Sequence, residues 1–433
     1  MHGRGWKHMK SFFTDFEPVE VLTPHSAVEV QEIIRKANRD KKPLVPVSSG
    51  TNLQDTHLPT VKGAIAVDLS RLKGIYFDSL NRNAVVEPGV TFQELERMCA
   101  EEGLRTLTAI DVPKTGSVLS TYLEMIPLYA WPKYHPWEML TMEGFRADGE
   151  RFATGQMAMT QERQDKYSWG VSFAMVARLY CQAQGTLGII TRAAITLKTS
   201  MKESKVLFFP CTGIAQVTRA LKAFLATEQP HEIFAVNRVY CADLLREKPS
   251  SSIPLWTVVI VLRGADAEEI AYKQKDMAAI AKTLGGGLLT TIQGMKHAAT
   301  TVLSEIKSPT GPSLHRNGKE WVPIVTIATA KQIAAAANLF GKNSGAIIMP
   351  LQSGGCFYYQ PDIRFECDDL RKVRNTYTTL CTKLLKAGVL FPRPSSLIAR
   401  QVSMQYPDNF KLLRSIKKAV DPRMIMNPGK LGL

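Results

Sequence analysis

Two turns of small residues carry the clearest chemistry in this sequence. The first, Ser48-Ser49-Gly50-Thr51-Asn52, directly follows the apolar run Leu44–Val47, which predicts a short buried strand. Backbone N–H groups in such a turn can form a nest for a phosphate, and small side chains let the ligand approach closely. The second turn, Gly185–Thr191, enters another apolar run and could bind an anion in the same way. Each turn taken alone is also typical of a plain connection between strands.

Several common motifs of enzymes are missing. The sequence has no GxGxxG fingerprint, no HExxH, no GxSxG elbow, and no P-loop, because Gly341-Lys342 is followed by asparagine. The eight histidines are scattered and the seven cysteines contain no CxxC pair, so we expect no metal site and no disulfide framework. Widely spaced thiols of this kind favour a reducing, cytoplasmic location.

The formal net charge of +15 is unevenly distributed along the chain. Residues 371–433 hold 13 Lys and Arg against 2 Asp and Glu, a net of +11. Nucleic acid, an anionic cofactor or substrate, and an acidic protein are the partners that such a segment could attract. Nucleic acid is the least favoured of the three, because the basic residues alternate with apolar ones and no zinc-finger or bZIP pattern accompanies them.

The elements that would position the two turns alternate between helix and strand. Two capping boxes, at residues 26–29 and 91–94, predict helices that begin there. A polar stretch at 199–205 separates this part from a second series of strands and helices, which gives an α+β pattern rather than strict βαβ repetition. The strands predicted in the first part lie at 44–47, 64–69 and 84–87.

The chain also lacks the patterns that address a protein to a membrane. The first ten residues are polar and basic, and no apolar run of about 7–15 residues follows them. No stretch approaches about 18 apolar residues without charge. We therefore expect neither a signal peptide nor a membrane span.

With these motifs in place, the order and spacing of several segments resemble the vanillyl-alcohol oxidase / p-cresol methylhydroxylase (PCMH-type) flavoproteins. The similarity covers about residues 18–200 and 388–433. The matching segments are the pyrophosphate loop at 47–52, the strand, turn and helix start at 85–91, the flavin-packing turn at 116–118, the ADGE…TG hairpin at 147–155, the last FAD strand at 182–191, Asp421-Pro422, and the closing Asn427-Pro428-Gly429-Lys430-Leu431-Gly432.

The resemblance implies an α+β fold with two domains. A PCMH-type FAD-binding domain of two subdomains would span residues 1–200, an α+β cap domain with an antiparallel sheet would span 205–385, and residues 386–433 would return to the FAD-binding domain. The implied activity is hydride transfer from a small organic substrate to flavin N5, with the flavin supplying the redox chemistry.

The resemblance also implies which residues hold FAD. Many relatives carry a histidine, covalently bonded to the flavin, where Thr51 stands here, so we expect FAD to be bound without a covalent link at this position. The expected cofactor-binding residues are Val47, Ser48, Ser49, Gly50, Thr51, Asn52, Pro113, Gly116, Ser117, Ser120, Gly185, Gly188, Ile190 and Lys430.

Candidate catalytic residues follow from one branch of the family. The segments 321–323 and 388–393 look like the branch that acts on para-substituted phenols, where tyrosines and an arginine stabilise a phenolate. Arg393 is therefore the first candidate, because a guanidinium can hold an oxyanion. The others are Tyr358, Tyr359, Arg364 and His135. Each has a plain structural explanation too: packing within a strand for the tyrosines, an ion pair for the arginine, and a surface loop for the histidine.

Two further functions remain open at this point. Glycolate oxidase-type relatives are 2-hydroxy-acid dehydrogenases, although their histidine-rich metal site is replaced here by residues 354–359, Gly-Gly-Cys-Phe-Tyr-Tyr. A flavin-binding subunit that relays electrons without its own substrate is the other alternative.

The expected partners are a small-molecule substrate and an acidic electron-carrier protein. The carrier would bind the basic segment, in which Lys411, Arg414, Lys417 and Lys418 have helical spacing and are expected to form a solvated face. We expect a homodimer or a hetero-oligomer, and neither nucleic acid nor a membrane as partner.

Overall fold

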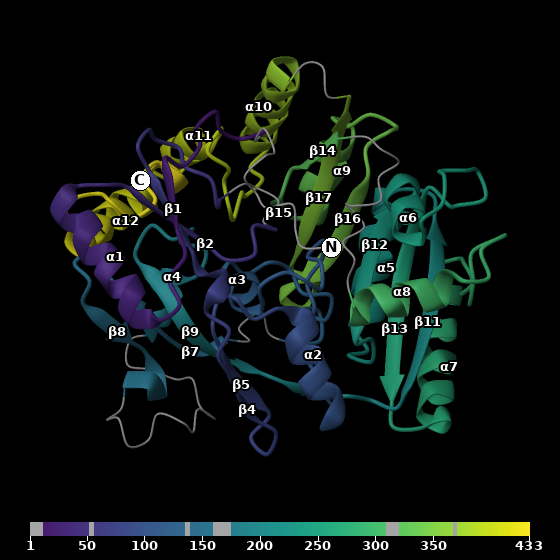
Figure 1. Ribbon diagram of the computed structural model, residues 1–433. Coiled ribbons are helices and arrows are strands. Elements are labelled where there is room, and N and C mark those ends of the chain that lie inside the picture. Colours follow the sequence, from purple (N-terminus) through teal and green to yellow (C-terminus); the bar gives the residue numbers. More distant parts are fainter. Residues whose placement is uncertain (1–11, 52–55, 135–138, 159–174, 309–319, 367–369) are drawn as a thin grey trace.

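The computed structural model describes residues 12–51, 56–134, 139–158, 175–308, 320–366 and 370–433. Within these ranges the strands form a three-stranded parallel sheet, a five-stranded antiparallel sheet, a seven-stranded antiparallel sheet and a two-stranded pair (Figure 1). Helices cover the sheets, so the chain has the α+β fold that the sequence predicted. No helix in the described ranges is long and apolar enough to cross a bilayer.

The small parallel sheet contains the strand that leads into the first turn. Its order is β1 (Glu20–Leu22), β3 (Ile65–Asp68) and β2 (Leu44–Val47). Helix α1 (Ala27–Asp40) packs against it with one apolar face, since its buried residues recur at helical spacing. The buried cluster between this helix and the sheet includes Val30, Ile34, Ala37, Leu44 and Val67.

The predicted helix starts at the two capping motifs are confirmed. The Ser26 hydroxyl accepts a hydrogen bond from the backbone N–H of Glu29, but the Glu29 carboxylate accepts from the N–H of His25 rather than from that of Ser26. Thr91 and Glu94 form the complete reciprocal box. Each box satisfies backbone donors that the first helical turn leaves open.

The five-stranded sheet carries the second turn at its centre. Its strands, in spatial order, are β4 (Ile75–Asp78), β5 (Asn83–Val86), β9 (Ile189–Thr196), β7 (Met139–Phe145) and β8 (Arg151–Ala153). The second turn leads directly into β9, the middle strand, so its position is set by pairing on both sides. The elements attached to this sheet are α2 (Phe92–Glu101), α3 (Val118–Leu123), α4 (Ala177–Tyr180) and the pair β6 (Leu104–Arg105) and β10 (Lys198–Thr199).

The seven-stranded sheet is buried on both faces. Its strands are β11 (Glu203–Cys211), β13 (Trp256–Gly264), β12 (Glu232–Asn237), β16 (Ala346–Leu351), β17 (Cys356–Phe365) and β14 (Glu320–Pro323), with β15 (Thr326–Ala328) also paired to β17. One face packs on α5 (Ile214–Leu225), α7 (Ala267–Thr283) and α9 (Ala330–Ala337). The other packs on α6 (Arg238–Leu245) and α8 (Ala298–Lys307).

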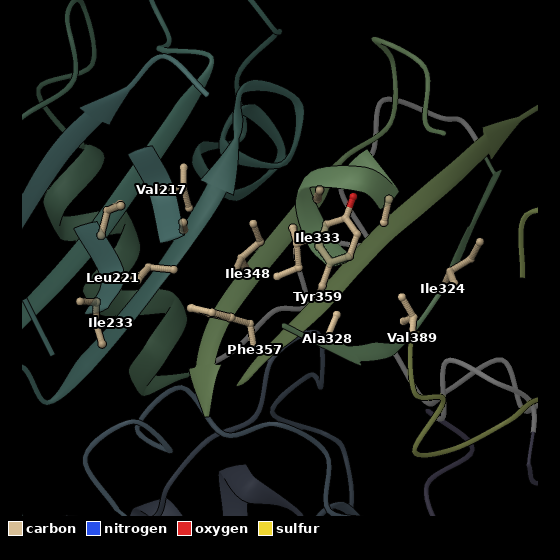
Figure 2. Close-up of a cluster of buried hydrophobic side chains, with 14 of the residues drawn as sticks. Val217, Leu221, Ile233, Ile324, Ala328, Ile333, Ile348, Phe357, Tyr359 and Val389 are labelled. Carbon is tan, nitrogen blue, oxygen red and sulfur yellow. The ribbon is translucent and has the colours of Figure 1, made fainter. Parts of the chain in front are cut away.

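Successive side chains of β17 enter different buried clusters, because strand residues alternate between faces. Phe357 and Tyr359 point into the cluster beneath α5 and α9, together with Ile333 and Ile348 (Figure 2). Tyr358 lies in the cluster on the opposite face, which it shares with Tyr129 from the first part of the chain.

The C-terminal helices bring the end of the chain back to the parallel sheet. Figure 1 shows α10 (Leu370–Lys386), α11 (Ala399–Gln405) and α12 (Pro407–Val420) leading toward β1 and β2. Beyond α12, the N–H of Leu44 donates to the carbonyl of Ile425 at 2.7 Å, and the N–H of Asn427 donates to the carbonyl of Leu44 at 2.8 Å. The last residues therefore extend the edge of β2.

A buried lysine on α12 holds this closure together. The Nζ atom of Lys417 donates to the carbonyls of Thr186 (2.6 Å) and Met426 (2.7 Å) and to Oδ2 of Asp421 (2.5 Å). Asp421 in turn accepts from the N–H groups of Ile425 and Met426. Burial lowers the pKa of Lys417, and the neighbouring carboxylate opposes that shift.

This arrangement corrects the expected solvated face of α12. Lys411, Arg414 and Lys418 are exposed, whereas Lys417 is fully buried. The reason is periodicity: Lys417 follows Phe410 at seven residues and so lies on the apolar stripe of the helix.

We predict that Lys417→Met strongly destabilises the protein, because it leaves the Asp421 carboxylate buried without its cation. Breaking a buried pair in this way costs about 3–5 kcal/mol. Urea unfolding followed by tryptophan fluorescence measures the effect, with Lys418→Met, an exposed neighbour on the same helix, as the matched control expected to change stability by less than about 0.5 kcal/mol. Equal unfolding midpoints for the two variants would contradict the role given to Lys417.

Candidate functional site

Ten of the fourteen residues expected to bind the cofactor gather along one cleft. It is lined by Val47, Ser48, Ser49, Gly50, Thr51, Ser117, Ser120, Gly185, Gly188 and Ile190. These residues come from the end of β2, the start of α3 and the turn into β9, so both small-residue turns face the same space. Apolar side chains continue the lining beyond the hydroxyl groups, among them Leu119, Leu123, Ile126 and Leu187.

Hydroxyl groups hold the first turn against the start of α3. Ser48 Oγ lies 2.7 Å from Ser120 Oγ, and Ser49 Oγ accepts from the backbone N–H of Ser117 at 3.1 Å. Ser49 Oγ also lies 2.9 Å from Thr51 Oγ1. Gly50 has a φ of +65°, a left-handed conformation that glycine adopts without strain. The turn therefore presents backbone and hydroxyl groups at one end of the cleft, as a diphosphate requires.

The two glycines of the second turn lie where a side chain would not fit. Gly185 has a φ of +69°, and a Cβ atom there would lie 2.4 Å from Cγ of Pro46. A Cβ atom on Gly188 would lie 2.6 Å from the carbonyl oxygen of Phe145. Gly185 thus packs on Pro46 of β2, the strand that leads into the first turn, and this close contact shapes the cleft.

Three of the expected cofactor residues, Pro113, Gly116 and Lys430, do not line the cleft. Asn52 lies outside the described residues. Gly116 packs behind the first turn, where a Cβ would lie 2.5 Å from Val112, and the carbonyl of Pro113 accepts from the N–H of Gly116. Lys430 is buried in the closing turn of the chain and does not line the cleft.

A second cavity of about 720 Å³ adjoins the cleft. The two share the lining residues Ile126, Ala183 and Leu187. The walls of the second cavity come from three parts of the chain: residues 110–187, strands β15 to β17, and the C-terminal segment from Leu390 onward. Most of the lining is apolar, including Ile110, Trp131, Val325, Ile327, Leu351 and Phe391.

Cys181 contributes to this apolar character. Burial raises the pKa of its thiol to about 12, so it stays protonated at neutral pH. Cys356 lines the same cavity, and burial raises its pKa as well.

A buried ion pair with unfilled hydrogen-bond positions lies where the cleft and the second cavity meet. Arg393 lines the cavity, Glu124 lines the cleft, and Arg393 Nε lies 3.3 Å from Glu124 Oε2. The contact lacks hydrogen-bond geometry: Nε and Nη2 of Arg393 and Oε2 of Glu124 have no hydrogen-bond partner among the described residues. Only 4% of Arg393 is exposed, so these open positions face the interior. Unpaired buried donors on a guanidinium are positions where a ligand oxygen gains binding energy.

Glu124 was not among the residues that we expected from the sequence. Its Oε1 atom accepts from the backbone N–H of Gln184 at 3.1 Å, and burial raises its pKa while Arg393 opposes the shift. A carboxyl group with a raised pKa is suited to exchange protons near neutral pH. One signal was available: Glu124 is the only charged residue between Lys114 and Lys133.

Tyr358 lines the same cavity as Arg393. Its hydroxyl donates to Oε1 of Gln360, and Gln360 Nε2 donates to Oδ2 of Asp111 at 2.7 Å. Burial raises the pKa of Tyr358, as does the negative charge of Asp111. The structure therefore brings together two of the five expected catalytic residues.

The structure places two of the others elsewhere, which corrects those expectations. Tyr359 points to the opposite face of β17 and packs in the hydrophobic core beside Phe340 (Figure 2). Arg364 is held in ion pairs with Asp243 and Asp362 and does not reach the cavity. His135, the fifth, lies outside the described residues.

Among the residues with described positions, no three His, Cys, Asp or Glu side chains are grouped to hold a metal ion.

Comparison with known proteins gives this geometry a context. Residues 18–124 match a family model described as an FAD binding domain, and residues 401–431 match the C-terminal domain of FAD linked oxidases. The chain is 22% identical to the 4-cresol dehydrogenase [hydroxylating] flavoprotein subunit of Pseudomonas putida over 96% of this chain and 88% of that protein. It is 29% identical to a D-lactate dehydrogenase of Archaeoglobus fulgidus over 95% of this chain and 90% of that protein.

A solved structure shows the same fold. The crystal structure of p-cresol methylhydroxylase with substrate bound superposes with a TM-score of 0.82, at 19% identity, over 95% of this chain and 88% of that chain. The matched FAD domain includes the first turn, α3 and Glu124, and the matched C-terminal domain includes Lys417 and the closing turn. Together with the cleft and its adjoining cavity, these matches identify the chain as an FAD-linked oxidoreductase with a PCMH-type FAD-binding fold.

Proposed function

We propose that this flavoenzyme oxidises an apolar substrate of aromatic size, an aryl alcohol or an alkylphenol, by hydride transfer to FAD. The observation that carries the proposal is the apolar cavity of about 720 Å³ that meets the cofactor cleft at Arg393 and Glu124. Cavities of this size and lining bury small organic ligands, and a few polar groups then fix their orientation.

The chain's own residues suit FAD in the adjoining cleft. The turn at residues 48–51 would hold the diphosphate, and the apolar continuation of the cleft would hold the ring system next to the cavity. FAD, when bound, supplies the acceptor for a hydride. We propose that residues 1–200 and 386–433 form the FAD-binding domain and residues 205–385 the cap domain that closes the cavity.

Arg393 and Glu124 would divide the work on the substrate. The open donors of Arg393 would bind the oxygen of a substrate hydroxyl. Oε2 of Glu124, 3.3 Å from Nε of Arg393, would then be placed to take the hydroxyl proton as the C–H bond breaks. In the oxidation of an alcohol to a carbonyl, the hydride leaves with the electron pair of the C–H bond and the O–H proton goes to the carboxylate, so charge and electrons balance.

The cavity disfavours the two alternative functions. A small hydroxy acid such as lactate has little apolar surface to place against the mostly apolar lining of this cavity. Its carboxylate would also meet a guanidinium whose charge Glu124 already balances. A relay subunit without its own substrate would have no use for unpaired buried donors, which are costly to keep.

An acidic electron carrier is the protein partner that the surface fits. Lys411, Arg414 and Lys418 project from the exposed side of α12, whose other side lines the cavity through Phe410 and Leu413. The relative from Pseudomonas putida is described as a flavoprotein subunit, which supports a partner that accepts electrons. We propose that this basic face positions such a carrier close to the flavin.

We predict that FAD is bound without a covalent link. Thr51 cannot form the histidyl bond made by relatives that have histidine there, and its hydroxyl is engaged with Ser49. Acid precipitation of the purified yellow protein should leave the flavin in the supernatant, where its absorbance is measured. A yellow pellet would show attachment through another residue.

We predict that Arg393→Met and Glu124→Gln each slow anaerobic flavin reduction by an aryl alcohol by about 10²–10³-fold. Stopped-flow absorbance measures the rate, and Arg400→Met, an exposed arginine on α11, is the matched control expected to behave as wild type. The role of Glu124 also predicts a pH dependence. Because Glu124 must be ionised to accept the proton and burial raises its pKa, reduction should slow as pH falls through that raised value. The low-pH loss should be absent in Glu124→Gln; its persistence would assign it to another group.

We predict that the triple variant Lys411→Glu, Arg414→Glu, Lys418→Glu slows turnover with an acidic cytochrome about tenfold or more, without changing the rate of flavin reduction by substrate. The wild-type rate with that cytochrome should fall as salt increases, because screening weakens the attraction. The control replaces Lys275 and Lys282 with glutamate. Both are exposed on α7, which covers the face of the seven-stranded sheet opposite to Tyr358 and the cavity. Equal effects from the two helices would leave net charge, not a docking face, as the cause.

A further inference from the structure

Three buried polar side chains, Tyr358, Gln360 and Asp111, form a hydrogen-bonded series that leads away from the cavity wall. The Asp111 carboxylate accepts from the hydroxyl of Tyr240 at Oδ1 (3.1 Å) and from Nε2 of Gln360 at Oδ2 (2.7 Å). Oε1 of Gln360 accepts from the hydroxyl of Tyr358. Asp111, Gln360 and Tyr358 are each almost fully buried, and of the three only Tyr358 lines the cavity.

The donors and acceptors of these groups fix the direction of the hydrogen bonds, which run from Tyr358 through Gln360 to Asp111. Both oxygens of Asp111 accept hydrogen bonds, and the amide of Gln360 turns its NH₂ group toward Oδ2. The amide oxygen then faces Tyr358 and can only accept. The hydroxyl proton of Tyr358 is therefore used in this bond, and what remains on its oxygen is a lone pair.

The backbone fixes the positions of Tyr358 and Asp111, the two ends of this hydrogen-bonded series. Tyr358 and Gln360 are two residues apart on β17, so their side chains lie on the same face of the sheet. Asp111 has a φ of +58°, a left-handed conformation that aspartate tolerates better than most residues. This backbone conformation and the pairing within β17 together fix the position of the Asp111 carboxylate beside the amide of Gln360.

We propose that Tyr358 determines specificity by offering the cavity a hydrogen-bond acceptor, and that Gln360 and Asp111 are positioning residues that fix this polarity. The ligand group that meets Tyr358 must be a neutral donor, such as a hydroxyl or an amine. An oxyanion there would face a lone pair instead of a proton. The proposal deepens the proposed function and rests on it only for the cavity as the substrate site.

Because Tyr358 offers a hydrogen-bond acceptor, the cavity differs from a site in which several hydrogen-bond donors surround a bound anion. The positive charge of Arg393 is balanced by Glu124, and Tyr358 gives no proton. The cavity therefore favours a neutral substrate with one oxygen that accepts from Arg393 and a second group that donates to Tyr358.

A pair of isosteric ligands tests the polarity without any turnover. 4-Hydroxyacetophenone and 4-acetylpyridine N-oxide have the same shape and the same carbonyl, but the para oxygen carries a proton only in the phenol. Binding is measured by the perturbation of the flavin absorbance spectrum, below the pKa of the phenol. We expect wild type to bind the phenol about tenfold more tightly, the size of one hydrogen bond gained against one lone-pair conflict. Raising the pH until the phenol ionises should weaken its binding.

Variants in the chain should change this preference selectively. Gln360→Leu removes the acceptor, so the Tyr358 hydroxyl can turn toward the cavity, and the preference should fall to about one or reverse. Asp111→Asn, which keeps the shape but lets the amides reverse, should reduce it as well. Tyr240→Phe is the matched control: it removes the other hydrogen bond to Asp111 but leaves the direction of Gln360 unchanged, so the preference should persist. Tyr358→Phe should abolish it.

Three results would overturn the proposal: tighter binding of the N-oxide by wild type, tighter binding of the ionised phenol, or equal loss of preference in Tyr240→Phe and Gln360→Leu. The last would mean that any damage to the cluster has the same effect. Should Gln360→Leu fail to fold, Asp111→Asn supplies the same comparison. Since binding alone is measured, an absence of flavin reduction by aryl alcohols would defeat the proposed function and leave this test intact.

Discussion

The return of the C-terminal segment to the parallel sheet, which closes the fold, depends on one buried ammonium group, that of Lys417. Lys417 uses all three of its donors, on two backbone carbonyls and one carboxylate, and Asp421 accepts from two backbone N–H groups besides. Full satisfaction is what makes a buried charge pair tolerable, since desolvating it otherwise costs more than the attraction returns. The acceptors lie in the turn before β9 and in the last residues of the chain. One side chain thus ties the middle strand of the antiparallel sheet to the edge of the parallel sheet.

Both spaces of the site follow from that closure. β2 leads into the first small-residue turn, and its edge is completed by residues 425–427, so the turn is positioned by the end of the chain. The same closing segment supplies Leu431 and Leu433 to the wall of the second cavity. Arg393 and Glu124, which are far apart in sequence, meet because the C-terminal segment returns across α3. The site is thus a property of the closed chain and belongs to no single element.

What the sequence could predict followed from local rules. The helix starts at Ser26 and Thr91, the small-residue turns and the α+β order depend on neighbours within a few residues, and the structure confirms them. The alternation within β17 separates Tyr358 from Tyr359, although we did not use it: Tyr358 shares its face with Gln360, Asp362 and Arg364, whereas Tyr359 alternates with Phe357, Pro361 and Ile363. Lys417 was wrongly expected on the solvated face of α12. Its spacing of seven residues from Phe410 put it on the apolar stripe, but we gave its charge more weight than this helical spacing. Glu124 had a readable signal, a single carboxyl group in a long uncharged segment, but its partner is fixed only by tertiary structure.

The two buried ion pairs of this region show how structure and function use the same chemistry differently. In the Lys417–Asp421 pair every ammonium donor has an acceptor, so nothing is left for a ligand and the pair holds the fold. In the Arg393–Glu124 pair the charges are balanced, yet two guanidinium nitrogens and one carboxylate oxygen have no hydrogen-bond partner among the described residues. Balanced charge makes burial affordable, while the open hydrogen-bond positions keep a free-energy cost that a bound ligand removes. The unsatisfied pair is the one that lies between the cleft and the cavity, where the substrate that we propose would remove that cost.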